Sequence, residues 1–148
     1  MRDSIDQQAS ATRRRHRLRR RDRKGTSVVE FAIVAPLFFM LLIGIIEVGR
    51  ALMVQQVLIN ASRVGARRAV MFSSTETAVI DAVEEYADGV GVDGVAVTVT
   101  PDPAAADSGD AVTVSVSIDF GNVSWLPSPW FMGGKTISAT SVMRKEGF

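Results

Sequence analysis

The sequence of 148 residues contains no cysteine and only one histidine, His16. The lack of cysteine excludes a disulfide framework, a thiolate metal site and a cysteine nucleophile. Because His16 lies in an arginine-rich N-terminal segment, the rest of the chain offers no serine–histidine or cysteine–histidine pair. No glycine-rich phosphate-binding motif is present. These absences predict a protein that is not an enzyme, with no catalytic residue, no cofactor and no small-molecule substrate.

Acidic side chains suited to a metal ion are also sparse. Asp102, Asp107 and Asp110 lie in one stretch that is rich in proline, glycine and alanine. Their spacing does not match the ligand positions of an EF-hand loop. Aspartates are common in surface turns, where they bond to nearby backbone groups. We therefore predict no metal site.

The charges are distributed very unevenly along the chain. Residues 1–25 contain ten Lys or Arg and three Asp, whereas the remaining residues contain seven basic and thirteen acidic side chains. An apolar stretch separates the two parts. Basic flanks of a membrane span stay in the cytoplasm. We therefore expect a single-pass inner-membrane protein with a cytoplasmic N-terminus and an extracytoplasmic C-terminal domain, and topology explains the basic arm without nucleic-acid binding.

The apolar stretch is long enough to cross a membrane. No charged residue occurs from Phe31 to Ile46, and the stretch from Val28 to Ile46 has 19 residues. At ~1.5 Å per residue it spans about 28 Å, close to the hydrocarbon thickness of roughly 30 Å. Three interpretations compete: a cleaved secretory signal, a plain membrane anchor and a type IV pilin-like N-terminus. Pro36 lies within the stretch and predicts a helix kink, either without function or as a soft point for extraction from the bilayer.

The third interpretation depends on Gly25, Thr26 and Glu30. In type IV pilin-like proteins a basic leader ends in glycine, and cleavage leaves a helix whose fifth residue is glutamate. Cleavage after Gly25 would make Thr26 the first residue and Glu30 the fifth. Glu30 would then lie one helical turn from the new α-amino group. Pairing with the amine of an adjacent subunit would remove two isolated charges from hydrocarbon, where they are costly.

These residues resemble the TadE-like (TadE/TadG) minor pseudopilins of tight-adherence (Flp) pilus systems. The resemblance is carried by GTSVVEFAIVAPLF at 25–38 and GIIEVGR at 44–50 and covers roughly 25–70. The stretch at 136–144 also resembles the strand that closes such proteins. It implies cleavage at Gly25 by a dedicated prepilin peptidase, with Glu30 as the assembly glutamate. It also implies residence in the inner membrane and a role in building or priming a pilus. Other pilins or pseudopilins and the Tad assembly machinery would be the partners.

Periodicity predicts two helices. The first runs from about Ser27 to Phe72, apolar on all sides at first and then amphipathic, with a stripe formed by Val54, Val57, Leu58, Ala61 and Val64. A capping box of Ser73 and Glu76 predicts the start of a second helix, which ends near Asp88 with Gly89 as its stop.

The period then changes to two, which predicts strands at 95–100, 112–120 and 136–144. The predicted fold class is α+β: a long pilin-like N-terminal helix, a second helix and a small antiparallel sheet of about three strands. The predicted parts are a cleaved basic leader at 1–25, a transmembrane helix at 26–50 and an extracytoplasmic domain at 51–148.

Several polar and aromatic residues are candidates for contacts with a partner: Glu47, Arg50, Arg63, Arg67, Trp125 and Trp130. The arginines of the helix form either a solvated face or a contact with an acidic subunit surface. The aromatic segment at 125–134 either folds over the open sheet or forms a contact surface for another pseudopilin or the membrane.

Three functions remain open from the residues alone. The first is a processed pseudopilin, and the second is an unprocessed, single-span anchored binding module. An exported enzyme is the third possibility, although no residue pattern indicates a substrate.

Overall fold

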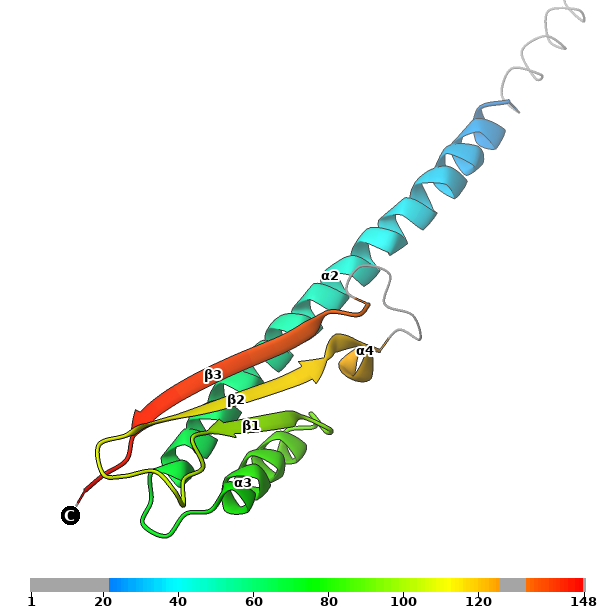
Figure 1. Cartoon of the computed structure of the whole chain (residues 1–148). Helices are drawn as coiled ribbons and strands as arrows, with labels where there is room; N and C mark the ends of the chain where they lie inside the picture. Colours follow the sequence, from blue (N-terminus) through cyan, green and yellow to red (C-terminus); the bar gives the residue numbers. More distant parts are fainter. Residues whose placement is uncertain (1–21, 126–132, 148) are drawn as a thin grey trace, which may run out of the picture. The chain divides into compact units, whose positions relative to one another are not determined.

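The computed structural model describes residues 22–125 and 133–147. The chain divides into two compact units, one up to Ile43 and one from Gly44 onward. In chain order the elements are α2 (Asp22–Ala69), α3 (Glu76–Gly89), β1 (Ala96–Thr100), β2 (Ala111–Asp119), α4 (Phe120–Val123) and β3 (Thr136–Arg144) (Figure 1). The α+β class, with a long apolar helix, a second helix and three antiparallel strands, is confirmed.

The sheet has the order β1-β2-β3, and both pairings are antiparallel (Figure 1). Val116 of β2 pairs with Val97 of β1 on one side and with Ala139 of β3 on the other. The even-numbered residues of β2 from Val112 to Ile118 are buried, as alternation requires when one face of the sheet meets the core. The opposite face carries mainly hydroxyl side chains: Thr98, Thr100, Thr113, Ser115, Ser117, Thr136, Ser138 and Thr140.

Two helices cover the apolar face of the sheet. The buried residues of α2 within this unit include Ala51, Val54, Leu58, Ala61, Ala66 and Ala69. Those of α3 are Val79, Val83 and Ala87. Gly65 marks the closest approach: a Cβ atom there would lie 2.6 Å from Val83 Cγ2 of α3 and 3.0 Å from Val114 Cγ1 of β2. The absence of a side chain at Gly65 therefore lets α2, α3 and β2 meet in one core.

The predicted helix ends need correction. Within the described residues helix α2 extends from Asp22 to Ala69, instead of from about Ser27 to Phe72. The residues before Ser27 include Arg23 and Lys24, which favour helix, so only Gly25 weakens that first turn. Helix α3 continues through Gly89, with Val90 as its C-cap, and the left-handed residue is Gly91 at φ 76°.

The predicted capping box is wrong. Thr75, not Ser73, is the N-cap of α3, and its side chain accepts a hydrogen bond from the Ala78 amide. Ser73 has φ 59°, which is a left-handed turn conformation and not the extended backbone of an N-cap. Thr75 has that extended backbone, with φ −114° and ψ 157°.

The second predicted strand extends one residue too far. Phe120 begins α4 and is not part of β2. Asp119 ends the strand because its Oδ1 accepts a hydrogen bond from the Gly121 amide at 2.7 Å, which caps the turn that follows. The turn places the Phe120 ring in the core, where it is fully buried. The strand at Thr136–Arg144 has the predicted bounds.

Candidate functional site

The residues of the expected processing site all lie in α2. Gly25, Thr26 and Glu30 follow one another on this helix without a break, and all three are exposed. Thr26 and Glu30 are four residues apart, which puts them on the same helix face about 6 Å apart along the axis. Within the described residues the Glu30 carboxylate has no hydrogen bond or ion pair. It is therefore available to a cation from outside the chain.

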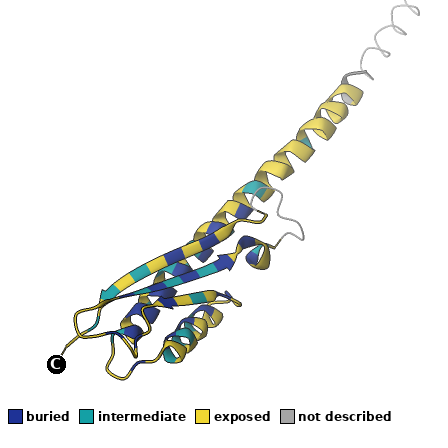
Figure 2. Ribbon diagram, in the orientation of Figure 1, coloured by how far each residue is buried: buried dark blue, intermediate teal, exposed yellow. Residues whose placement is uncertain are grey.

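The apolar run after Glu30 is exposed in the single chain (Figure 2). Every large apolar side chain from Phe31 to Ile46 is at least a third exposed, and the helix is long and apolar enough to cross a membrane. Such a surface requires lipid or other helices around it. The helix assignment continues through Pro36, which is also exposed. The kink at this position stays a prediction.

A second set of residues surrounds Glu47, directly after the apolar run. The Glu47 side chain is only 3% exposed. Its Oε1 accepts a hydrogen bond from Ser124 Oγ at 2.7 Å. Its Oε2 is buried and has no hydrogen-bond partner among the residues that the structure describes. A buried carboxylate is costly unless it is paired, so the Ser124 bond is a strong local constraint on the segment after α4.

Arg50 lies one turn further along α2 and holds the same segment. Its Nε donates to the Val123 carbonyl at 3.1 Å, and its guanidinium carbon lies 5.7 Å from the centre of the Trp125 ring. That distance suits a cation–π interaction. The Trp125 side chain is 76% exposed. We name Glu47, Arg50, Ser124 and Trp125 the tryptophan clamp.

The structure brings together three of the six residues expected to contact a partner. Glu47 and Arg50 of α2 bind the segment that contains Trp125, so part of their role is to stabilise contacts within the chain. Arg63 and Arg67 are exposed on α2, and no hydrogen bond or ion pair is recorded for either within the described part of the chain. Trp130 lies outside the described residues. Trp125 is exposed, and most of the aromatic segment lies outside the described residues, so both interpretations of this segment stay predictions.

Sequence reasoning missed Ser124 and Gly65, and it placed the core residue Phe120 in the strand instead of in α4. Ser124 is separated from Glu47 by 77 positions, and no local pattern indicates that the two side chains meet. Asp119 followed by Gly121 is a turn signal that would have ended the strand before Phe120. Gly65 falls on the buried stripe seven residues after Leu58, a spacing that indicates close packing.

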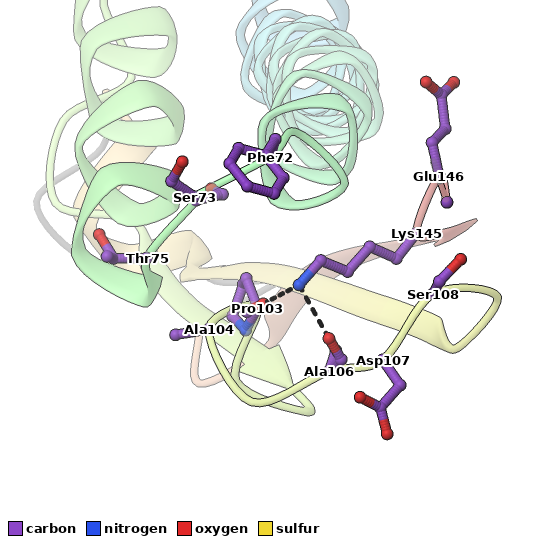
Figure 3. A pocket seen from close by; sticks show the side chains of 12 residues that line it. Phe72, Ser73, Thr75, Pro103, Ala104, Ala106, Asp107, Ser108, Lys145 and Glu146 are labelled. Carbon is purple, nitrogen blue, oxygen red and sulfur yellow. Dashed lines mark hydrogen bonds between the residues drawn. The ribbon is translucent and has the colours of Figure 1, made fainter.

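The described residues also line an open hollow of about 490 Å³ between the end of α2 and the C-terminal segment (Figure 3). Lys145 Nζ donates to the carbonyls of Pro103 and Ala106 at 2.6 and 2.8 Å. These bonds tie the C-terminal segment to the loop after β1. No group of three metal-ligating side chains occurs within 22–125 and 133–147. The hollow thus has a structural cation but no nucleophile–base pair among its described lining residues.

Comparison with known families addresses the N-terminal part of the chain. The family model described as TadE-like protein matches residues 25–67. This helix is TadE-like. The match starts at Gly25, where cleavage was expected, and includes the other site residues of α2: Thr26, Glu30, Pro36, Glu47, Arg50, Arg63 and Arg67. It ends within α2, before α3 and the sheet. No curated protein and no solved structure matches the chain.

Proposed function

We propose that the chain is a minor pseudopilin that takes part in the assembly or initiation of a Flp/Tad-type pilus. TadE-like proteins are pilus-associated, and the family match includes both Gly25 and Glu30. The observation that carries the proposal is the position of an exposed, unpaired Glu30 at the head of an exposed apolar helix, five residues after Gly25. The proposed role is structural and not enzymatic.

Cleavage after Gly25 supplies the chemical partner of Glu30. The new α-amino group of Thr26 carries a positive charge at neutral pH. In the bilayer a lone carboxylate and a lone ammonium are each unfavourable, and pairing between adjacent subunits lowers the energy of both. Gly25 also weakens the helix by about 1 kcal/mol relative to alanine. Local unwinding at the scissile bond is therefore easier there than elsewhere in the first turns.

The proposed location is the inner membrane, with residues 1–25 in the cytoplasm and the domain from 51 to 148 outside it. Ten basic residues in the leader favour retention on the cytoplasmic side. A prepilin peptidase, other pilins or pseudopilins and the Tad machinery are the proposed partners. Arg63 and Arg67 are proposed to contact acidic surfaces of neighbouring subunits, because they are exposed and have no recorded partner in the described part of the chain.

The alternative is an unprocessed, single-span anchored module. It is favoured by the buried core of residues 44–148, which forms a compact unit by itself. The two functions differ in what the cell loses when the chain is absent.

Deletion of the chain tests the proposed function. We expect cells without it to have few or no Flp-type pili in electron micrographs, and the full-length sequence supplied from a plasmid to restore them. The matched control is a plasmid that encodes residues 51–148 behind an unrelated membrane anchor, which should not restore pili. Normal piliation in the deletion strain would contradict the pilus function and leave the anchored module.

A further inference from the structure

Two tryptophans are present in the chain, and the structure places one of them at the end of the apolar run. The run ends at Ile46. Arg50, whose guanidinium lies over the Trp125 ring, is four residues further along the helix. This corresponds to about 6 Å along the axis. Arg50, whose guanidinium contacts the Trp125 ring, is therefore about one helical turn beyond the last residue of the uncharged stretch.

The surroundings of Trp125 have the character of a membrane interface. Ile45, Ile46 and Val48 are each at least half exposed and continue the apolar surface up to the level of the clamp. Arg50 adds a positive charge at the same level. Tryptophan is enriched where hydrocarbon meets headgroups, since its ring is apolar and its N–H needs a polar partner. Arginine near a helix end extends its charge into the same layer.

The tryptophan clamp keeps the ring in this position. Ser124 Oγ donates to Glu47 Oε1, and Arg50 Nε donates to the Val123 carbonyl, so two consecutive residues before Trp125 are bonded to α2. Glu47 is buried, so its carboxylate is not displayed on the surface beside Trp125. Arg50 has five N–H donors, and the recorded bonds to Val123 and Met53 use two of them. The others can reach a phosphate.

We propose that Trp125 and Arg50 form an interfacial anchor: the indole ring lies at the carbonyl level of the bilayer, and the Arg50 guanidinium binds a phospholipid phosphate. The exposed apolar side chains of Ile45, Ile46 and Val48, which precede Arg50 on α2 within the same unit, favour lipid over a protein partner as the occupant. Glu47 and Ser124 are positioning residues in this arrangement. The proposal requires membrane insertion of α2 but does not depend on cleavage at Gly25 or on pilus assembly.

Depth-dependent fluorescence quenching tests the anchor. The full chain with Trp130→Phe has Trp125 as its single tryptophan. It is reconstituted into vesicles of phosphatidylcholine and phosphatidylglycerol, and only protein that floats with the vesicles is measured. Lipids carry a spin label at the headgroup, near the carbonyls or near the end of the acyl chain. We expect the strongest quenching from the label near the carbonyls and weak quenching by aqueous iodide.

A variant tests whether the hydrogen bond between Ser124 and Glu47 positions the Trp125 ring in the bilayer. Ser124→Ala removes the hydrogen bond to Glu47, and we expect quenching by the carbonyl-level label to fall by roughly twofold or more, because bonds to charged groups are among the stronger ones. Thr98→Ala, which removes an exposed hydroxyl from the outer sheet face, should leave quenching unchanged. Circular dichroism of both variants monitors folding. Arg50→Gln provides a second readout. With Arg50 present we expect quenching by the carbonyl-level label to increase with the phosphatidylglycerol content of the vesicles, and we expect Arg50→Gln to lose this increase.

The proposal is overturned if vesicle-bound protein shows full quenching of Trp125 by iodide and none by any lipid label. It is also overturned if the Trp125 signal is shielded from iodide and from every lipid label alike, since that result assigns the surface to contact between protein copies. In both cases flotation of the protein with vesicles would still support membrane anchoring, and piliation would be tested separately.

Discussion

We expect Glu30→Val to abolish pili while the protein still inserts into the membrane. The substitution makes α2 more apolar, so insertion should not be impaired, but in the proposed assembly the amine of Thr26 in a neighbouring processed subunit would lose its counter-charge. Removal of one partner from a buried ion pair typically costs about 3–5 kcal/mol. This corresponds to a factor of about 100 or more in the equilibrium constant for adding a subunit. Pili counted in electron micrographs, together with the amount of protein in the membrane fraction, measure the effect.

The control for this variant is Glu85→Val, which removes an exposed carboxylate from α3. It changes the net charge equally but leaves the membrane segment intact, and we expect normal pili. Glu30→Gln should be intermediate at best, because an amide oxygen can accept a hydrogen bond from the amine but carries no charge. Normal piliation with Glu30→Val would show that this carboxylate has no part in assembly.

We expect Gly65→Leu to unfold the unit from Gly44 onward. Even the Cβ atom of the new side chain would lie 2.6 Å from Val83 Cγ2 and 3.0 Å from Val114 Cγ1, and the remaining atoms have no space between α2, α3 and β2. Overpacking of a core costs about 1–3 kcal/mol for small excess volumes and more for large ones. Domains have only about 5–15 kcal/mol of stability in total. Thermal unfolding of the detergent-solubilised chain, followed by circular dichroism, should show a large loss or no folded baseline.

Gly49→Leu is the matched control, on the same helix and with the same change of residue. No atom lies within 4 Å of a Cβ at Gly49, and the position is exposed. Replacing a helical glycine with leucine is expected to add up to about 1 kcal/mol to helix stability. If the Gly65→Leu and Gly49→Leu variants had equal melting temperatures, that result would contradict the packing described for the core.

The elements with long, regular patterns could be predicted from sequence, and those set by a single local choice could not. The alternation from Val112 to Ile118 can bury only one face, so β2 and the outer hydroxyl face follow from it. By contrast, Ser73 and Thr75 are both good caps, and the choice between them depends on the left-handed turn at Ser73. The end of β2 depends on one hydrogen bond from the Gly121 amide to Asp119.

The candidate site also contains a part that could be predicted from sequence and a part that could not. Gly25, Glu30 and the apolar run lie close together in sequence, and their spacing on a helix is fixed by helix geometry alone. Glu47 and Arg50 were recognised as polar residues at the end of the run, but their contacts with Ser124 and Trp125 join positions 75 or more residues apart. Such contacts depend on how the sheet is placed against α2, and no short-range pattern contains that information.

The mature N-terminus of the native protein is the most direct test of the account. The protein is extracted from membranes of cells that contain the matching prepilin peptidase, and its intact mass is measured beside that of a Gly25→Leu variant. We predict that the native protein begins at Thr26 and that the variant retains the leader. A native protein that still carries Arg23 and Lys24 would contradict the pseudopilin account and leave an anchored domain.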